Sequence, residues 1–157
     1  MRIFQQLLIQ SSNLTTFSSM SDFRYLLDTN IVSELVKNPQ GRLAEKMLAS
    51  GWEKYSCTSI IVACELRYGA AKKQSPKLTF NVAQVLASLP VLPFQDAADA
   101  TYAIIRTNLE QRGLPISCHD LLIAAHAYSL NLILVTANEQ EFSRVPDLKV
   151  ENWFKDA

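Results

Sequence analysis

The segment Tyr25-Leu26-Leu27 has the composition of a strand buried on both faces, and it ends at an acid, Asp28. Consecutive apolar residues are typical of interior strands in parallel sheets, whose two faces are both covered. Helical spacing follows in residues 31–36. Open α/β sheets bind their ligands at the C-terminal ends of strands. We therefore expect Asp28 to lie in a binding site, because a buried carboxylate needs a cation or hydrogen-bond donors.

Strand-like and helix-like segments alternate along the rest of the chain. Predicted strands cover residues 55–58, 90–94, 132–135 and 148–150, the last at a sheet edge. Predicted helices cover residues 43–48, 60–73, 78–89, 96–110 and 119–127, with a short helical turn ending at Phe142. We expect Gly51 to end the first of these helices and Ser59 to cap the second. The alternation predicts βαβ units, and hence an α/β domain whose parallel sheet is covered on both sides.

Composition excludes several classes of protein. The 157 residues suit one ordinary domain, and 48% hydrophobic against 19% charged residues is typical of a folded globular chain. No apolar run approaches the ~20 residues that span a bilayer, so we expect no membrane association. The cysteines, Cys57, Cys64 and Cys118, are odd in number and scattered, which argues against disulfides or structural zinc and indicates a cytoplasmic protein. Zero net charge argues against a nucleic-acid coat protein but not against a nuclease.

Residues 1–19 differ in character from the rest of the chain. An apolar stretch too short and too polar for a signal peptide is followed by a Ser/Thr run of loop character up to Ser19. We expect residues 1–19 to be a disordered or mis-annotated extension and Met20 to be the true start, which makes 20–157 the domain. Intact-mass measurement of the native protein tests this, because a mass that includes Met1 would reject it. A weak organelle-targeting segment is the alternative.

Two further acids lie among apolar residues. Glu65 falls inside the apolar helix that follows Ser59, although glutamate is also common on the wet face of a helix. Asp120 opens another apolar helix, where Ser117-x-x-Asp120 equally fits a capping box. The segment Thr136-x-x-Glu139 has the same double interpretation. A capping acid is not thereby excluded from a site, since a carboxylate has several acceptor positions.

Asp28, Glu65 and Asp120 come from different βα units, and together they predict a site for a hard divalent cation. Mg²⁺ prefers oxygen ligands and retains several waters, so two or three carboxylates and a substrate phosphate satisfy it. Three clustered anions without a cation would repel one another and raise at least one pKa. Such an ion activates water and neutralises charge on a phosphoryl group. The prediction requires that the three side chains converge in one pocket.

Four segments in order carry a family resemblance: Tyr-Leu-Leu-Asp28-Thr-Asn, Ser59-Ile-Ile-Val-Ala-Cys-Glu65-Leu-Arg-Tyr-Gly, Gly113-Leu-Pro-Ile-Ser-Cys-His-Asp120-Leu-Leu-Ile-Ala-Ala-His-Ala and Leu-Val-Thr136-Ala-Asn138-Glu-Gln-Glu-Phe142. They resemble the motifs of PIN-domain ribonucleases, in particular the VapC-type toxins of type II toxin–antitoxin systems. The resemblance runs from about Phe23 to Trp153, nearly the whole domain.

The resemblance implies a three-layer α/β/α domain around a mostly parallel sheet of four to five strands. It implies a Mg²⁺-dependent endoribonuclease, with Mn²⁺ as an alternative ion, whose metal ligands and catalytic acids are Asp28, Asp120 and Glu65. It further implies a homodimer, inhibition by a VapB-type antitoxin whose tail often brings an arginine to the acids, and contact with operator DNA only through that antitoxin. Close toxin relatives suggest tRNA as the RNA substrate.

Further residues receive supporting roles. We expect Thr136, Asn138 and Asn30 to bond to the acids or to bound waters. Arg67, Lys72 and Lys73 follow Glu65 on one helix and are candidate phosphate contacts, although cations are also favoured at a helix end. Lys77 belongs to the same basic group.

The chain also departs from the family pattern. Ala137 stands where relatives carry a polar residue, and Asn138 stands where some carry a fourth acid. His119 precedes Asp120 where relatives have an apolar residue, and we interpret it as solvent-facing. His126, in an apolar helix, is expected to be a core histidine.

Two other classes remain open at this point. A PIN-like module with weak or lost catalysis would bind only RNA or an antitoxin, and Ala137 mildly favours it while the three acids oppose it. A phosphoacceptor domain with Asp28 as the acceptor is disfavoured, because no paired acid or suitably placed lysine is evident. Metal-titrated RNA cleavage and acetyl-phosphate labelling separate these classes.

Overall fold

The computed structural model describes residues 22–95 and 97–155, which form alternating strands and helices. The predictions for residues 1–19 and for a helix start at Asp96 fall outside these residues. The strands are β1 (Tyr25–Leu27), β2 (Ser56–Ser59), β3 (Val91–Leu92), β4 (Ile133–Val135) and β5 (Val150–Glu151). The helices are α2 (Thr29–Lys37), α3 (Arg42–Ser50), α4 (Ile60–Lys72), α5 (Pro76–Ser88), α6 (Ala98–Gln111), α7 (Cys118–Ser129) and α8 (Glu139–Phe142), and a 3₁₀ turn covers Trp52–Tyr55.

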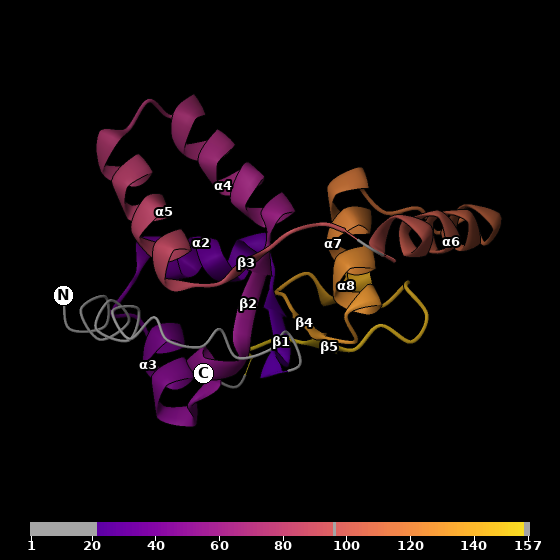
Figure 1. Cartoon of the computed structure of the whole chain (residues 1–157), viewed down its shortest axis with the longest axis horizontal. Helices are drawn as coiled ribbons and strands as arrows, with labels where there is room; N and C mark the ends of the chain where they lie inside the picture. The colour runs from indigo at the N-terminus through magenta and orange to yellow at the C-terminus, as the bar shows by residue number, and fades with distance from the viewer. Residues whose placement is uncertain (1–21, 96, 156–157) are drawn as a thin grey trace.

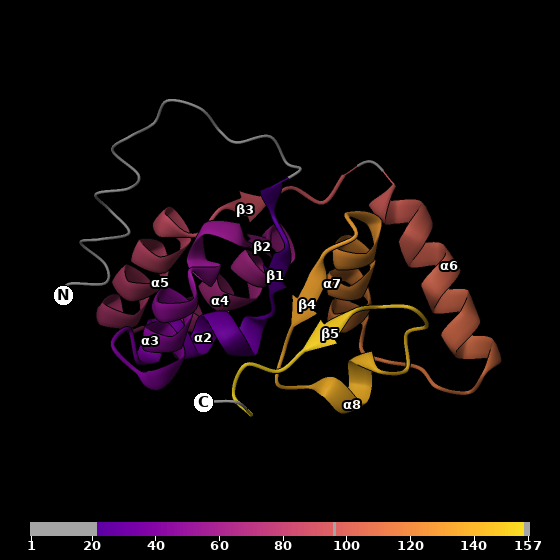
Figure 2. The same ribbon diagram turned by 90° about the horizontal axis from the view of Figure 1, so that it is seen from below.

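All five strands are parallel, in the order β3-β2-β1-β4-β5. Helices α2 to α5 lie on one side of the sheet, and α6 and α7 lie on the other (Figures 1 and 2). The α4–α5 pair forms an antiparallel hairpin that extends away from the sheet (Figure 1). The predicted three-layer α/β/α fold with a central parallel sheet is therefore confirmed, and β5 is an edge strand as expected.

Strand β1 is the centre of the sheet, as its apolar sequence predicts. Leu26 and Leu27 are fully buried, and so are Leu134 and Val135 of the neighbouring strand β4. Leu27 pairs with Thr58 on one side and with Val135 on the other. The backbone N–H of Asp28 continues this ladder by donating to the Val135 carbonyl at 2.9 Å. The first acid is thereby fixed at the C-terminal edge of the sheet.

Strand β2 is buried although its side chains are polar. Ser56 donates to the Trp52 carbonyl at 2.8 Å, Thr58 donates to the Leu27 carbonyl at 2.7 Å, and the Cys57 thiol contacts the Tyr25 carbonyl at 3.3 Å. Each side chain thus bonds to nearby backbone, and this removes the cost of burying a polar group without a partner. Burial in apolar surroundings raises the pKa of the Cys57 thiol to about 12.

Capping residues set the boundaries of three helices, and the sequence predicted two of them, the Ser59 cap and the end at Gly51. The Ser59 hydroxyl accepts from the Ile61 N–H at 3.1 Å and starts α4, which carries Glu65. Ser75 caps α5 and Pro76 occupies its first turn, where a missing N–H costs nothing. Gly51 ends α3 with a φ of 68°, a left-handed conformation that glycine adopts without strain.

The end of the chain is anchored by aromatic packing. Trp153 is 2% exposed and stacks on Trp52 with ring centroids 4.2 Å apart. Tyr25 of β1 meets the same ring edge-on at 5.0 Å. Stacked and edge-to-face aromatic pairs stabilise a fold beyond the area that they bury. The segment after β5 is consequently held against the start of the central strand.

Buried His126 lies on α7, as expected of a core histidine. It is 1% exposed, and its Nδ1 lies 2.8 Å from the Ser59 hydroxyl. Burial lowers the pKa of this imidazole, with the Pro93 backbone partly opposing the shift. None of the helices in the described residues has the length and apolar character to cross a bilayer.

Candidate active site

The three predicted acids line a single pocket at the C-terminal edge of the sheet. Asp28 directly follows β1, Glu65 lies on α4, and Asp120 lies in the first turn of α7. The pocket has a volume of about 370 Å³ and is also lined by α2 residues and by Asn138. Asp28 and Glu65 are 37 positions apart in the chain, and Glu65 and Asp120 are 55 positions apart, yet all three face one cavity. We call this cavity the acid pocket.

Asp28 is the deepest of the acids, at 3% exposure. One carboxylate oxygen accepts from the Thr29 N–H at 2.7 Å, and the other accepts from the Thr136 hydroxyl at 2.6 Å and from the Asn30 amide at 3.0 Å. Burial raises the pKa of Asp28, the bonds from Thr136 and Thr29 oppose the rise, and the charges of Asp120 and Glu65 add to it. The three acids therefore interact electrostatically.

Thr136 and Asn30 contact Asp28 directly, as expected for supporting residues. The Asn30 amide also donates to the Thr136 hydroxyl at 3.2 Å, and its oxygen accepts from the Ala137 N–H at 2.9 Å. Ala137 thus contributes a backbone group to the network despite its apolar side chain. The Asn138 backbone N–H donates to the Thr136 hydroxyl at 3.0 Å, whereas its side-chain amide donates to Glu141 at 3.3 Å. Asn138 lines the pocket without bonding to any of the three acids within the described residues.

Glu65 is turned into the pocket, with 26% of its side chain exposed. The Thr29 hydroxyl donates to one of its carboxylate oxygens. His119 Nδ1 lies 3.4 Å from the other oxygen, although the His119 side chain is 69% exposed. The alternative of an unengaged Glu65 on the wet face of α4 is therefore wrong. His119 faces solvent as expected, but it is also a neighbour of the acid pocket, a contact that the sequence did not reveal.

Asp120 forms only half of the predicted capping box. Its backbone N–H donates to the Ser117 hydroxyl at 3.2 Å, but the return bond is absent because the Ser117 N–H donates to Glu141 at 3.3 Å. The Asp120 carboxylate is thereby left facing the pocket. Burial raises the pKa of Asp120, the charges of Glu141 and Glu65 add to the rise, and Ser117 and His119 oppose it.

The second predicted capping box, Thr136-x-x-Glu139, is wrong. Asn138 is the residue that precedes α8, and the Thr136 hydroxyl donates to Asp28 instead of capping that helix. Glu139 pairs with Lys155 at 2.5 Å and accepts from the Asn152 amide at 3.0 Å. These contacts lower the pKa of Glu139, with Lys155 as the largest cause. Glu139 therefore fastens the C-terminal segment and takes no part in the acid pocket.

The donor set of the acid pocket fits a hydrated hard cation. Its ligating groups are carboxylate oxygens. Burial raises the pKa of Asp28 and of Asp120, and repulsion from neighbouring carboxylates adds to the rise, which a bound divalent ion would relieve. Within residues 22–95 and 97–155, no group of three or more His, Cys, Asp or Glu side chains is arranged so that it could hold a metal ion.

The predicted basic group lies outside this cavity. Arg67 and Lys72 on α4 and Lys73 just after it are exposed, and none of them lines the acid pocket. The lysine that does line it is Lys37 of α2, which the sequence prediction missed. A signal was present, because Thr29, Ser33 and Lys37 recur every four residues, the spacing of one helix face.

The fold and the pocket together have the features of a nuclease of the PIN class. The model of the PIN domain family matches residues 25–148. Ribonuclease VapC2 of Rickettsia felis is 38% identical over 133 residues, which is 83% of this chain and 98% of the relative. The tRNA(fMet)-specific endonuclease VapC of Shigella flexneri is 36% identical over 131 residues, with the same shares covered.

Solved structures agree with this similarity to VapC proteins. The chain superposes on VapBC2 from Rickettsia felis, bound to a DNA fragment from its promoter, with a TM-score of 0.73 and 36% identity, covering 83% of this chain and 99% of the other. DNA-bound VapBC from Salmonella typhimurium gives a TM-score of 0.73 and 33% identity, covering 83% and 98%. The chain therefore belongs to the PIN-domain family, in its VapC ribonuclease branch.

Proposed function

We propose that this chain is a Mg²⁺-dependent endoribonuclease toxin that hydrolyses RNA phosphodiester bonds, with Mn²⁺ as an alternative ion. The observation that carries the proposal is the convergence of Asp28, Glu65 and Asp120 in one pocket. The relatives named as VapC ribonucleases support RNA as the substrate, and the tRNA(fMet)-specific relative supports tRNA in particular.

Asp28 and Asp120 would hold the ion, and Glu65 would hold it or a second ion, or position the attacking water. The bound ion supplies an acidified water and neutralises charge that develops on the phosphoryl group. Thr136 and Asn30 fix the Asp28 carboxylate through bonds of 2.6 and 3.0 Å, so that it does not rotate away from the pocket. Asn138 is the third supporting residue.

The proposed reaction is in-line hydrolysis. The water oxygen forms a bond to phosphorus, and the bond from phosphorus to the 3′ oxygen breaks. One water proton is transferred to solvent or to Glu65, and the departing 3′ oxygen takes a proton from solvent. The products carry a 5′-phosphate and a 3′-hydroxyl, and the 2′-hydroxyl takes no part. Arg67, Lys72 and Lys73 on the exposed face of α4 are proposed to contact phosphates farther along the RNA.

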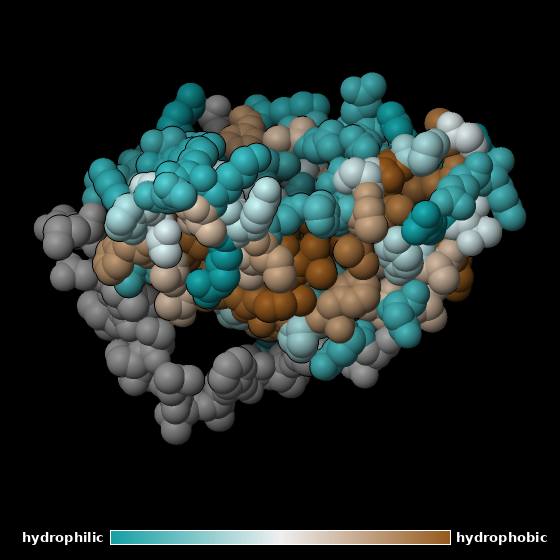
Figure 3. All heavy atoms as spheres, turned by 90° about the horizontal axis from the view of Figure 1, so that it is seen from above, coloured by the Kyte–Doolittle hydropathy of each residue, from teal (hydrophilic) through white to brown (hydrophobic). Residues whose placement is uncertain are grey.

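We also propose that the chain forms a homodimer and is neutralised by a VapB-type antitoxin in the cytoplasm. The VapBC complexes among its structural neighbours support the antitoxin, and the DNA bound in two of them, a promoter fragment in one, supports operator contact through that partner. Apolar side chains gather in the middle of one face of the molecule (Figure 3), which supports a protein-covered surface there. Light scattering of the purified chain measures the oligomeric state.

The decisive experiment is cleavage of tRNA and of total RNA by the purified chain, with Mg²⁺, with Mn²⁺ and with excess EDTA. We expect cleavage only with metal, and its loss in Asp28→Asn and Asp120→Asn. A matched control is Asp99→Asn, because Asp99 also accepts from the N–H of the next residue, at 2.7 Å, but is exposed on α6. Cleavage at the wild-type rate in excess EDTA would contradict the proposal.

A second candidate function is favoured by one residue. Ala137 lacks the polar side chain that relatives carry, which fits a PIN-like module that binds RNA or an antitoxin with weak catalysis. RNA binding without metal-dependent cleavage by the wild-type chain would support this alternative. The Ala137 N–H donates to the Asn30 side chain, so the network around Asp28 forms without a polar side chain at position 137.

A further inference from the structure

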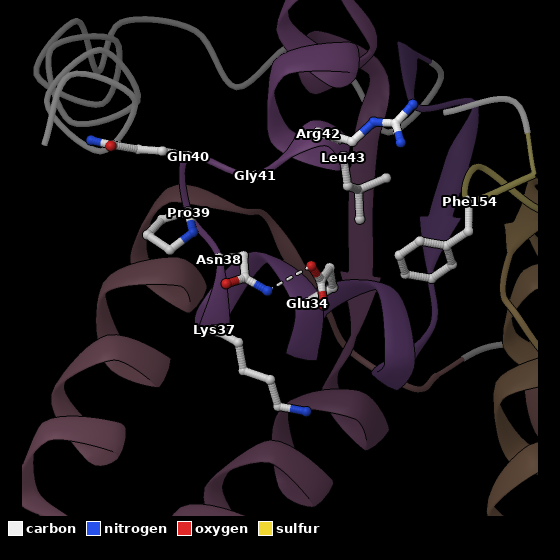
Figure 4. Close-up of a pocket in the computed structure, with 9 residues that line it drawn as sticks. All are labelled: Glu34, Lys37, Asn38, Pro39, Gln40, Gly41, Arg42, Leu43 and Phe154. Carbon is white, nitrogen blue, oxygen red and sulfur yellow. Dashed lines mark hydrogen bonds between the residues drawn. The ribbon is translucent and has the colours of Figure 1, made fainter.

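A second cavity of about 660 Å³ adjoins the acid pocket at the other end of α2. It is formed where α2 turns into α3, and the ring of Phe154 closes one side (Figure 4). Glu34 and Lys37 line both cavities. The two are therefore neighbours along one helix, whose nine residues span about 12 Å between its first and last Cα atoms. We call the second cavity the flanking cavity.

The charged side chains that line the flanking cavity are two cations, Lys37 and Arg42, and one acid, Glu34, which leaves a net positive charge. Within the described residues, Lys37 and Arg42 have neither an ion-pair nor a side-chain hydrogen-bond partner, and both are exposed. Glu34 lies between them and accepts a hydrogen bond from the neutral Asn38 amide at 2.8 Å, so it keeps its charge (Figure 4). The net positive charge of the lining favours an anionic ligand.

Phe154 is an exposed aromatic ring on a fixed support. Its residue is 36% exposed, although the preceding Trp153 is buried and stacked on Trp52. The Phe154 N–H donates to the Asn152 side chain at 3.0 Å, and the next residue, Lys155, is tied to Glu139. These contacts fix the backbone that carries the ring, so a flat ligand that stacks on the ring has less of the chain to order.

We propose that the flanking cavity binds an unpaired nucleotide next to the RNA bond that the acid pocket cleaves. The base stacks on Phe154, and Lys37 and Arg42 contact the adjoining phosphates. This inference rests on the proposed ribonuclease activity. One RNA strand supplies a base that can stack on the aromatic ring and phosphates that can meet the two cations, and α2 connects the cavity to the acids. Glu34 and Asn38 offer an acceptor and a donor to a base edge.

The test uses the full chain carrying Asp120→Asn, so that RNA is bound without being cut, and fluorescein-labelled oligouridylate as the probe. Phe154→Ala is expected to weaken binding about ten-fold, the size of the loss of one stacked base. Phe154→Trp keeps a ring and is expected to bind as well as the parent. Phe80→Ala is the matched control, because Phe80 is 63% exposed on α5 and lines neither cavity.

Lys37→Gln tests the charge independently of the ring. Each lost contact to a single-strand phosphate reduces the slope of log Kd against log salt by about 0.7, and we expect that change for Lys37→Gln and for Arg42→Gln. A merely structural role of these exposed residues would leave the salt slope unchanged. Thermal melting of every variant is recorded alongside, and unchanged melting assigns the losses to binding.

The outcomes separate this inference from the proposed function. If the unmodified chain fails to cleave RNA with any divalent ion, the proposed function fails. If it cleaves RNA but Phe154→Ala, Lys37→Gln and Arg42→Gln bind oligouridylate like the parent with the same salt slope, the inference alone is overturned. A loss of affinity for an acidic antitoxin peptide with RNA affinity intact would also overturn it, and would identify the cavity as a protein-binding site.

Discussion

Replacing Thr136 by valine removes the one hydroxyl that ties the end of β4 to the acid at the end of β1. Thr136 is fully buried and donates to Asp28 at 2.6 Å, while it accepts from the Asn138 N–H at 3.0 Å and from the Asn30 amide at 3.2 Å. Valine has nearly the same shape, so packing is preserved and the change tests the hydrogen bonds. We expect Thr136→Val to lower the stability of the protein.

The size of the loss follows from the partners. A hydrogen bond to a buried charged group contributes about 1.5–3 kcal/mol, more than a neutral one. The Asn30 amide and the Asn138 N–H, which donate to the Thr136 hydroxyl, add little to this loss. Asn30 keeps its bond to Asp28, and Asn138 is half-buried, so water can replace the hydroxyl there. The expected loss is thus about 2–3 kcal/mol, which lowers Tm by about 4–12 °C in a chain of this size.

The loss has a defined pH dependence. The Thr136 bond lowers the pKa of Asp28, which burial otherwise raises, so the bond stabilises the charged carboxylate. Removing it raises the pKa of Asp28 in the folded state further above the ordinary value of 3.8. The difference in unfolding free energy between wild type and Thr136→Val is therefore largest above that folded pKa and shrinks as the pH falls through it.

Urea denaturation at a series of pH values, without divalent metal, measures this difference. Thr136→Ser retains a hydroxyl and should recover most of the stability. Thr101→Val is the control, because the Thr101 hydroxyl donates only to a backbone carbonyl of its own helix on the exposed surface of α6. If Thr136→Val costs no more than Thr101→Val, or costs the same at every pH, the assigned role of Thr136 is wrong.

Two other predictions concern titrating groups. Without metal, Asp120→Asn should melt no lower than wild type, since it removes a partly buried charge that Glu141 and Glu65 repel. In differential scanning calorimetry, Mg²⁺ should raise the Tm of the wild-type protein but not that of Asp120→Asn. The unfolded His126 has an ordinary pKa of 6.5 and the folded one is lower, so stability should fall as the pH drops below 6.5, by at most about 1.4 kcal/mol per pH unit. His126→Leu should lose that slope in urea titrations, and an unchanged slope would show that another group causes it.

The fold was predictable because its determinants are local. The apolar run before Asp28, the hydroxyl of Ser59 before an apolar helix and the glycine at position 51 each act within a few residues. Alternation of such signals then allows few arrangements other than a covered parallel sheet. The meeting of Asp28 and Thr136 follows from the same topology, because parallel strands direct their C-terminal ends to one edge, whereas Glu65 and Asp120 reach that edge from α4 and α7.

The contacts between the acids and their neighbours were harder to predict, because they join distant parts of the chain. Thr29 donates to Glu65 across 36 positions, and neither residue type indicates the other in the sequence. His119 faces solvent as predicted, but its contact with Glu65 was missed because its helix position does not show which side chains lie opposite. Whether Lys37 or the lysines of α4 reach the acid pocket depends on the direction in which two helices leave the sheet, which periodicity does not give.

The hydrogen bonds around Asp28 determine which ligands the acid pocket favours. All of the donors to Asp28 in the described residues are neutral: a backbone N–H, a hydroxyl and an amide. Neutral donors fix the direction of the carboxylate without cancelling its charge, and the charges of Asp120 and Glu65 still raise its pKa. The pocket therefore keeps an unfavourable charge that a ligand can relieve, since the free energy gained on binding includes the repulsion removed. A divalent ion and a cationic side chain from an inhibitor would both gain from this, so the two should compete for the pocket.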